Sequence, residues 1–112
     1  GGNDFWLESS LKISAVEQVE LLSGLYSNSF GCDEKNISAV KDSMFIGSSE
    51  RGKLYGKTGT GAVNGKNVNG SFIGFVESGN GPVFFAVNME GGSTGADAGE
   101  TAVRILSYMG LY

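Results

Sequence analysis

The residues best suited to bind a ligand lie in one short stretch, Lys53 to Gly61, which reads K-L-Y-G-K-T-G-T-G. Lys57 offers an ammonium group, Thr58 and Thr60 offer hydroxyls, and the glycines leave backbone N–H groups uncovered. This set suits an anionic ligand that bears a carbonyl group. A basic, flexible turn is the alternative interpretation, and K-T-G on its own does not decide between the two.

Composition limits both the fold and the class of partner. The 112 residues suffice for one domain, and 19 glycines favour strands and turns over a helical bundle. A net charge of −4 disfavours nucleic-acid binding. There is no histidine and one cysteine, Cys32, which we interpret as an ordinary loop or core thiol, so we expect no metal and no cofactor. The sequence contains no apolar run long enough to span a membrane and opens with no signal peptide, which is compatible with a cut from a longer protein.

Hydrophobic spacing predicts helices first and strands afterwards. Ser14 and Glu17 form a capping box that starts the first helix, and Gly47 fits the end of the second. The pattern predicts, in order, a helix over 15–26, a second helix from 33 or 36 to 45, three strands over 53–60, 71–78 and 82–90, and a final helix over 98–109. Residues 61–69 are expected to be a loop that turns at Asn64-Gly65.

This order predicts an α+β fold: two helices, a three-stranded antiparallel meander, and a C-terminal helix packed on the sheet. The second and third strands carry apolar residues at nearly every position, so both faces of the sheet need cover. The final helix can cover one face only. We therefore expect residues 1–112 to be the second half of a larger domain.

Five separated motifs together resemble a known family. They are Phe5-Trp6-Leu7-Glu8, Leu11-Lys12-Ile13-Ser14, Glu17-Gln18-Val19, the stretch Tyr55 to Gly61, and Phe72-Ile73-Gly74-Phe75-Val76. In this order they resemble the C-terminal half of class D β-lactamases and, more closely, the sensor domains of BlaR/MecR-type β-lactam receptors. The resemblance covers essentially the whole chain.

The resemblance implies a β-lactamase/transpeptidase-like fold and a ligand site built around Lys57. Lys57 would orient the carboxylate of the drug, Thr58 or Thr60 would hydrogen-bond that carboxylate, and the Thr60 N–H would be one oxyanion-hole donor. Gly59 belongs to the same binding strand. Trp6 would hold a carboxylated lysine of the family through its indole N–H, with core packing as the alternative.

The resemblance also implies that no catalytic residue lies in this chain. In the family the nucleophilic serine stands in an S-x-x-K motif, which would precede Gly1. Ser38-Ala39-Val40-Lys41 has that spacing, but it follows Trp6 where the family's motif precedes it, so we interpret it as coincidence. We expect the chain to be inactive alone.

Two departures from the class D pattern bear on function. Residues 90–99 contain no arginine that could bind the drug's carboxylate, since Arg104 lies well inside the final helix, and Ser71 stands where the family commonly has tryptophan. The first departure favours a sensor over a hydrolase. The resemblance then implies β-lactam recognition in a membrane-anchored antibiotic-resistance receptor that acts by antirepressor signalling.

Three functions remain as alternatives: the sensor, a class D serine β-lactamase that hydrolyses the drug, and a decayed domain without ligand chemistry. The implied partners are a β-lactam and the upstream half of the same domain. The implied location is the extracellular face of a bacterial plasma membrane, or, for a hydrolase, secretion. An isolated chain is expected to self-associate through its uncovered strands.

Overall fold

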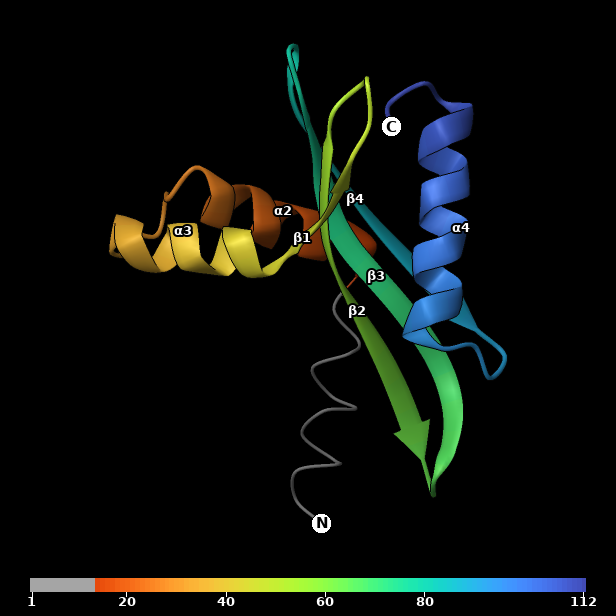
Figure 1. Ribbon diagram of the computed structural model, residues 1–112. Coiled ribbons are helices and arrows are strands. Elements are labelled where there is room, and N and C mark those ends of the chain that lie inside the picture. The colour runs from red at the N-terminus through yellow and green to blue at the C-terminus, as the bar shows by residue number, and fades with distance from the viewer. Residues whose placement is uncertain (1–13) are drawn as a thin grey trace.

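A four-stranded antiparallel sheet organises the computed structural model, which describes residues 14–112 (Figure 1). The elements follow in the order α2 (Ala15–Tyr26), α3 (Glu34–Ser43), β1 (Phe45–Ser48), β2 (Lys53–Val63), β3 (Lys66–Ser78), β4 (Gly81–Glu90) and α4 (Gly95–Tyr108). The strands lie in the order β1-β2-β3-β4, so each strand pairs with its neighbour in sequence. The predicted α+β class is confirmed, with four strands in place of three.

Both long amphipathic helices begin at capping boxes. In α2 the Ser14 hydroxyl accepts from the Glu17 N–H at 3.1 Å, and the Glu17 carboxylate accepts from the Ser14 N–H at 3.3 Å. This helix has the bounds that the sequence predicts. In α4 the same reciprocal bonds join Thr94 and Asp97, so that helix starts three residues before its predicted beginning.

The prediction for the second helix was wrong at its C-terminal end. The helix α3 ends at Ser43 with Met44 as its C-cap, and Phe45–Ser48 form the edge strand β1 instead of a last helical turn and its stop. Phe45 lies opposite Tyr55 and Ser48 opposite Lys53. Pairing with β2 therefore overrides the helical spacing of the preceding apolar residues.

The predicted loop over 61–69 was also wrong, although its turn is confirmed. The strands β2 and β3 stay paired as far as Val63 and Lys66, with a register shift after Gly61. Asn64 and Gly65 form the turn with φ values of 52° and 77°, as a two-residue hairpin turn requires. Figure 1 shows this hairpin reaching past the start of α4.

Helices cover the two faces of the sheet unequally. The helix α4 lies on one face, where Phe72 and Leu54 are buried against Ala98, Ala102 and Leu106. On the other face α2 packs against β4 and β3, and buried Leu22 meets Tyr55 and Phe75. Figure 1 shows the pair α2 and α3 on one side of the sheet and α4 on the other.

No helix within residues 14–112 has the length and apolar character that crossing a lipid bilayer would demand.

Candidate functional site

The predicted binding residues lie on β2 at the point where its pairing with β1 stops. The short strand β1 pairs only with Lys53–Tyr55, and the Gly56 N–H donates to the Met44 carbonyl at 2.8 Å. Beyond Gly56, no strand of the described residues pairs with this edge of β2. We call the stretch Lys57 to Thr60, on this unpaired side, the open edge.

Strand alternation determines which backbone groups reach the open edge. The Gly56 N–H points toward this side of β2, whereas the Gly61 N–H points toward β3, where it donates to Asn69 Oδ1 at 3.1 Å. Backbone groups alternate between the two sides of a strand, so Thr58 and Thr60 direct their N–H and C=O groups to the open edge. The two N–H groups are spaced by about 6.6 Å, twice the rise per residue.

The two threonine side chains lie on the face that α4 covers. The Gly95 N–H donates to Thr60 Oγ1 at 2.8 Å, and a Cβ placed on Gly95 would come within 2.8 Å of Thr58 Cβ. Thr60 thus anchors the first turn of α4 on β2. Its hydroxyl is engaged within the fold, which the sequence did not reveal.

Lys57 points to the opposite face, because side chains alternate along a strand. Tyr55, two residues before it, stacks on Phe75 in the cluster beneath α2. Lys57 is exposed, and its ammonium group can meet a ligand that approaches over the α2 side of the open edge. The four consecutive residues Lys57 to Thr60 therefore lie along one strand edge, but their side chains are divided between the two faces of the sheet.

Close packing requires a glycine at position 56 and leaves little room at position 59. A Cβ on Gly56 would collide with the buried ring of Phe72, whereas one on Gly59 would meet only the Ser71 hydroxyl oxygen, 2.9 Å away. Ser71 lies opposite Gly59, and its hydroxyl donates to the Gly59 carbonyl at 3.4 Å. The serine that departs from the family pattern thus contacts the binding strand directly.

Trp6, the remaining predicted site residue, lies outside the described residues. Ser9 and Lys12, which also have the S-x-x-K spacing, lie outside them as well and, like Ser38, follow Trp6 in sequence. Ser38 is exposed on α3, and Lys41 forms an ion pair with Glu77. That ion pair gives Lys41 a contact within the fold and agrees with the interpretation of Ser38–Lys41 as coincidence.

A polar cluster that sequence reasoning missed lies near this site. Lys41 Nζ is 2.6 Å from Glu77 Oε2, and the Tyr26 hydroxyl donates to the same oxygen at 2.6 Å. Lys41 also lies over the rings of Tyr26 and Tyr55, at 5.4 and 5.3 Å from their centroids. The cluster Tyr26–Lys41–Glu77 joins α2, α3 and β3.

Each member of this cluster shifts the titration of the others. The hydrogen bond to Glu77 raises the pKa of Tyr26, and the contact with Glu77 likewise raises the pKa of Lys41. Partial burial pushes the pKa of Glu77 upward, but the bonds from Lys41 and Tyr26 outweigh it and leave that pKa lowered. All three shifts favour neutral Tyr26 beside a charged Lys41–Glu77 pair.

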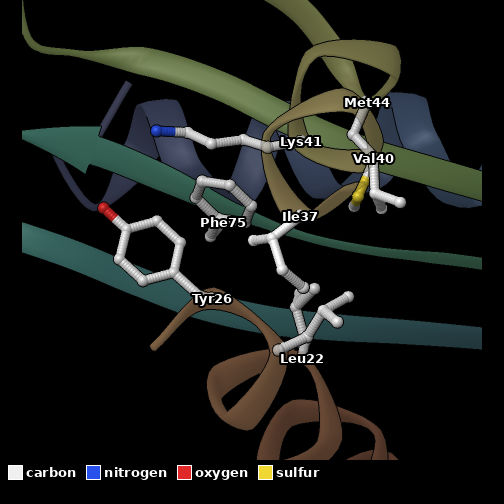
Figure 2. A pocket seen from close by; sticks show the side chains of 8 residues that line it. Leu22, Tyr26, Ile37, Val40, Lys41, Met44 and Phe75 are labelled. Carbon is white, nitrogen blue, oxygen red and sulfur yellow. The ribbon is translucent and has the colours of Figure 1, made fainter. Parts of the chain in front are cut away.

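A cavity of about 280 Å³ opens beside this cluster, between α2, α3 and the sheet (Figure 2). Its lining residues are Leu22, Leu25, Tyr26, Ile37, Val40, Lys41, Met44 and Phe75. The lining is mostly apolar and includes none of the residues of the open edge. The cavity and the candidate site are therefore separate features.

An antiparallel sheet between helices and a K-T-G strand with an open edge agree with the penicillin-recognising class that the sequence motifs indicate. The family model of the penicillin binding protein transpeptidase domain matches residues 1–107. The chain belongs to this family.

Relatives place the chain more narrowly within that family. It is 43% identical over 111 residues to the regulatory protein BlaR1 of Bacillus licheniformis and 42% identical over 113 residues to the methicillin resistance mecR1 protein of Staphylococcus aureus. These matches cover 97% and 99% of this chain but 18% and 19% of the relatives. The chain thus spans about a fifth of the length of these relatives.

Solved structures agree with this placement. The C-terminal domain of the Bacillus licheniformis BlaR penicillin-receptor matches 89% of this chain and 42% of its own chain, with a TM-score of 0.83 and 42% identity. A class D β-lactamase from Bacillus subtilis matches with a TM-score of 0.78 and 31% identity, over 88% of this chain and 40% of its own. The resemblance drawn from the sequence motifs, and the transpeptidase-like fold that it implied, are confirmed.

Proposed function

We propose that this chain is the C-terminal half of a penicillin-binding sensor domain and supplies the strand that recognises a β-lactam. The open edge of β2 carries the proposal, because Thr58 and Thr60 direct to it backbone groups that no strand within residues 14–112 pairs, beside the cation of Lys57. A ligand carbonyl can accept from such an edge in the way that an added strand does. The chain matches 42% of the solved receptor domain, and we assign the nucleophilic serine to the rest of that domain.

Each residue of the open edge then has a chemical role. When the serine oxygen attacks the β-lactam carbonyl carbon, negative charge gathers on the carbonyl oxygen. The C=O bond then re-forms as the ring C–N bond breaks, and the ring nitrogen takes up a proton in place of the one that the serine hydroxyl has lost. The Thr60 N–H would stabilise that oxygen, and Lys57 would attract the carboxylate of the drug. We assign the hydroxyl contact with the carboxylate to Thr58 or Thr60, whose side chains lie on the α4 face of the open edge; the Thr60 hydroxyl accepts from the Gly95 N–H and keeps its own hydrogen to donate. Gly59 lies between them, on the strand that approaches the drug.

Two observations favour a sensor over a hydrolase: the names of the relatives of this chain, and the lack of arginine around the first turn of α4. The relatives BlaR1 and mecR1 are named as regulatory and resistance proteins. Residues 90–99 offer no arginine to a drug carboxylate. The whole protein would then be a receptor whose sensor lies on the extracellular face of the bacterial plasma membrane. Similarity to class D β-lactamases keeps a hydrolase as the second candidate.

A fluorescent penicillin distinguishes these functions. The complete natural protein that contains this sequence should form one covalent adduct per molecule, and the adduct should persist. Rapid loss of the adduct with continued turnover would establish the hydrolase instead, and no adduct at all would overturn the proposal. The isolated chain serves as the control: an adduct at Ser38 or Ser9 would place the nucleophile within residues 1–112.

A further inference from the structure

We propose that the cluster Tyr26–Lys41–Glu77 positions the open edge of β2 for ligand recognition. The inference rests on the proposed function, because it deepens the account of the same site. None of the three residues belongs to the open edge, so they act through the groups that they hold in place.

The cluster connects three elements at a single carboxylate oxygen. Tyr26 is the last residue of α2, Lys41 lies in the last turn of α3, and Glu77 lies near the end of β3. Both Tyr26 and Lys41 contact Glu77 Oε2 at 2.6 Å. Figure 2 shows the polar ends of Tyr26 and Lys41 extending to the same side, away from Leu22 and Met44.

One path from the cluster to the open edge runs through the end of α3. Lys41 lies one helical turn before Met44, and the Met44 N–H donates to the Lys41 carbonyl at 3.0 Å. The Met44 carbonyl accepts from the Gly56 N–H at 2.8 Å. Gly56 directly precedes Lys57, so the position of α3 sets the place where β1 leaves β2 and the open edge begins.

A second path runs through the aromatic rings beneath the strand. Lys41 Nζ lies 5.3 Å from the centroid of the Tyr55 ring, which stacks on Phe75 at 4.7 Å. Tyr26 meets the same Phe75 ring edge-on at 5.0 Å. Tyr55 shares its face with Lys57, two residues away. Lys41 thus contacts the Tyr55 ring and Tyr26 contacts the Phe75 ring, and these two stacked rings lie beneath the binding strand.

The test uses variants of the complete protein and two readouts. Lys41→Met and Glu77→Gln should release the end of α3 and so accelerate hydrogen exchange at the Gly56 amide. They should also lower the rate constant of penicillin acylation per folded molecule by about tenfold, below the roughly hundredfold loss that a misplacement of 1 Å can cause. The variant Lys41→Arg should keep the exchange rate and the acylation rate of the wild type, because a guanidinium can pair with Glu77 and stack on tyrosine rings.

The exposed pair Arg104–Glu100 of α4, 3.2 Å apart, provides the matched control. Arg104→Met and Glu100→Gln remove the same chemistry far from the cluster and should change neither readout. If a cluster variant does not fold, Tyr26→Phe keeps the ring, removes only the hydroxyl and carries the test alone.

Folded cluster variants with unchanged Gly56 exchange, or with unchanged acylation, would overturn the inference while leaving the proposed function intact. A wild-type protein that penicillin does not acylate would instead refute the proposed function. Gly56 exchange would in that case still show whether the cluster holds the end of α3.

Discussion

At the scale of single residues, Lys57 has the largest proposed part in binding the drug. It is exposed on the α2 side of the open edge, beside the backbone groups that Thr58 and Thr60 direct outward. Its function is electrostatic, so its loss should affect ligand chemistry much more than folding.

Lys57→Ala in the complete protein should slow acylation by a factor that corresponds to about 1.5–3 kcal/mol, because a charge-assisted contact with the drug is lost. Stopped-flow measurement with a fluorescent penicillin gives the rate. Lys66→Ala, at an exposed position beyond the turn of the same hairpin, should leave it unchanged. Equal acylation rates for Lys57→Ala and the wild type would contradict the assigned role.

Glu77 should make stability depend on pH in acid. Its pKa is lowered in the folded state, so its contribution is fully present above the ordinary pKa of a glutamic acid and is lost as the pH falls through the lowered value. The unfolding free energy of the complete protein should therefore decline less steeply in acid for Glu77→Gln than for the wild type. Parallel declines in urea titrations across that range would show that Glu77 contributes nothing there.

At the scale of elements, the contact of α4 with β2 fixes the back of the binding strand. A Cβ on Gly95 would lie 2.8 Å from Thr58 Cβ and 2.9 Å from the Gly59 backbone. Gly99, one turn later, has its nearest neighbour at 3.6 Å, in ordinary contact with Phe72. Only at Gly95 does α4 approach β2 too closely for a side chain.

Gly95→Ala in the complete protein should therefore cost about 1–3 kcal/mol of unfolding free energy, because α4 must move away from β2. Gly99→Ala should be tolerated and should even stabilise by about 0.5–1 kcal/mol, since it removes a glycine from a helix interior. Chemical denaturation of both variants measures the difference. An order of stability opposite to this one would mean that α4 does not lie on the binding strand as described.

The sequence predicted the elements whose signals are local. The capping box Ser14–Glu17 and the turn Asn64-Gly65 lie within a few residues of each other, and both are confirmed. The strand β1 was missed because the helical spacing of Ile37, Val40 and Met44 leads up to Phe45, and only pairing with distant Tyr55 makes Phe45 extended.

Only part of the candidate site could be predicted, because only part of it depends on a local sequence signal. K-T-G-T is a local motif, and its residues were found by reading the sequence. The cluster beside it depends on Tyr26 and Glu77, which are 51 positions apart, and on Lys41, whose helix carries no local sign of a partner in β3. Packing alone brings these side chains together.

At the scale of the whole molecule, the described residues leave apolar surface and strand edges uncovered. Phe45 and Ile46 of the edge strand β1 are 49% and 50% exposed, and Val83 of the other edge strand β4 is 38% exposed. Edges of this kind pair with other chains, and exposed apolar patches mark places of contact. We expect the remainder of the domain to cover them.

The isolated chain of 112 residues should accordingly self-associate in solution. Light scattering at micromolar concentration should give a mass well above the 11.7 kDa of one chain. A cooperatively folding monomer of that mass would show that the sheet needs no further cover. The proposal that the chain is half of a domain would then have to be abandoned.

We propose that the open edge of β2 receives the drug, and a crystal structure of the complete domain acylated by benzylpenicillin would show the contacts that the drug makes. We expect the acyl carbonyl oxygen to lie within hydrogen-bonding distance of the Thr60 backbone nitrogen, about 2.7–3.1 Å away. We also expect the carboxylate of the drug to lie beside Lys57. A covalently bound drug that touches neither group would show that the open edge does not receive it.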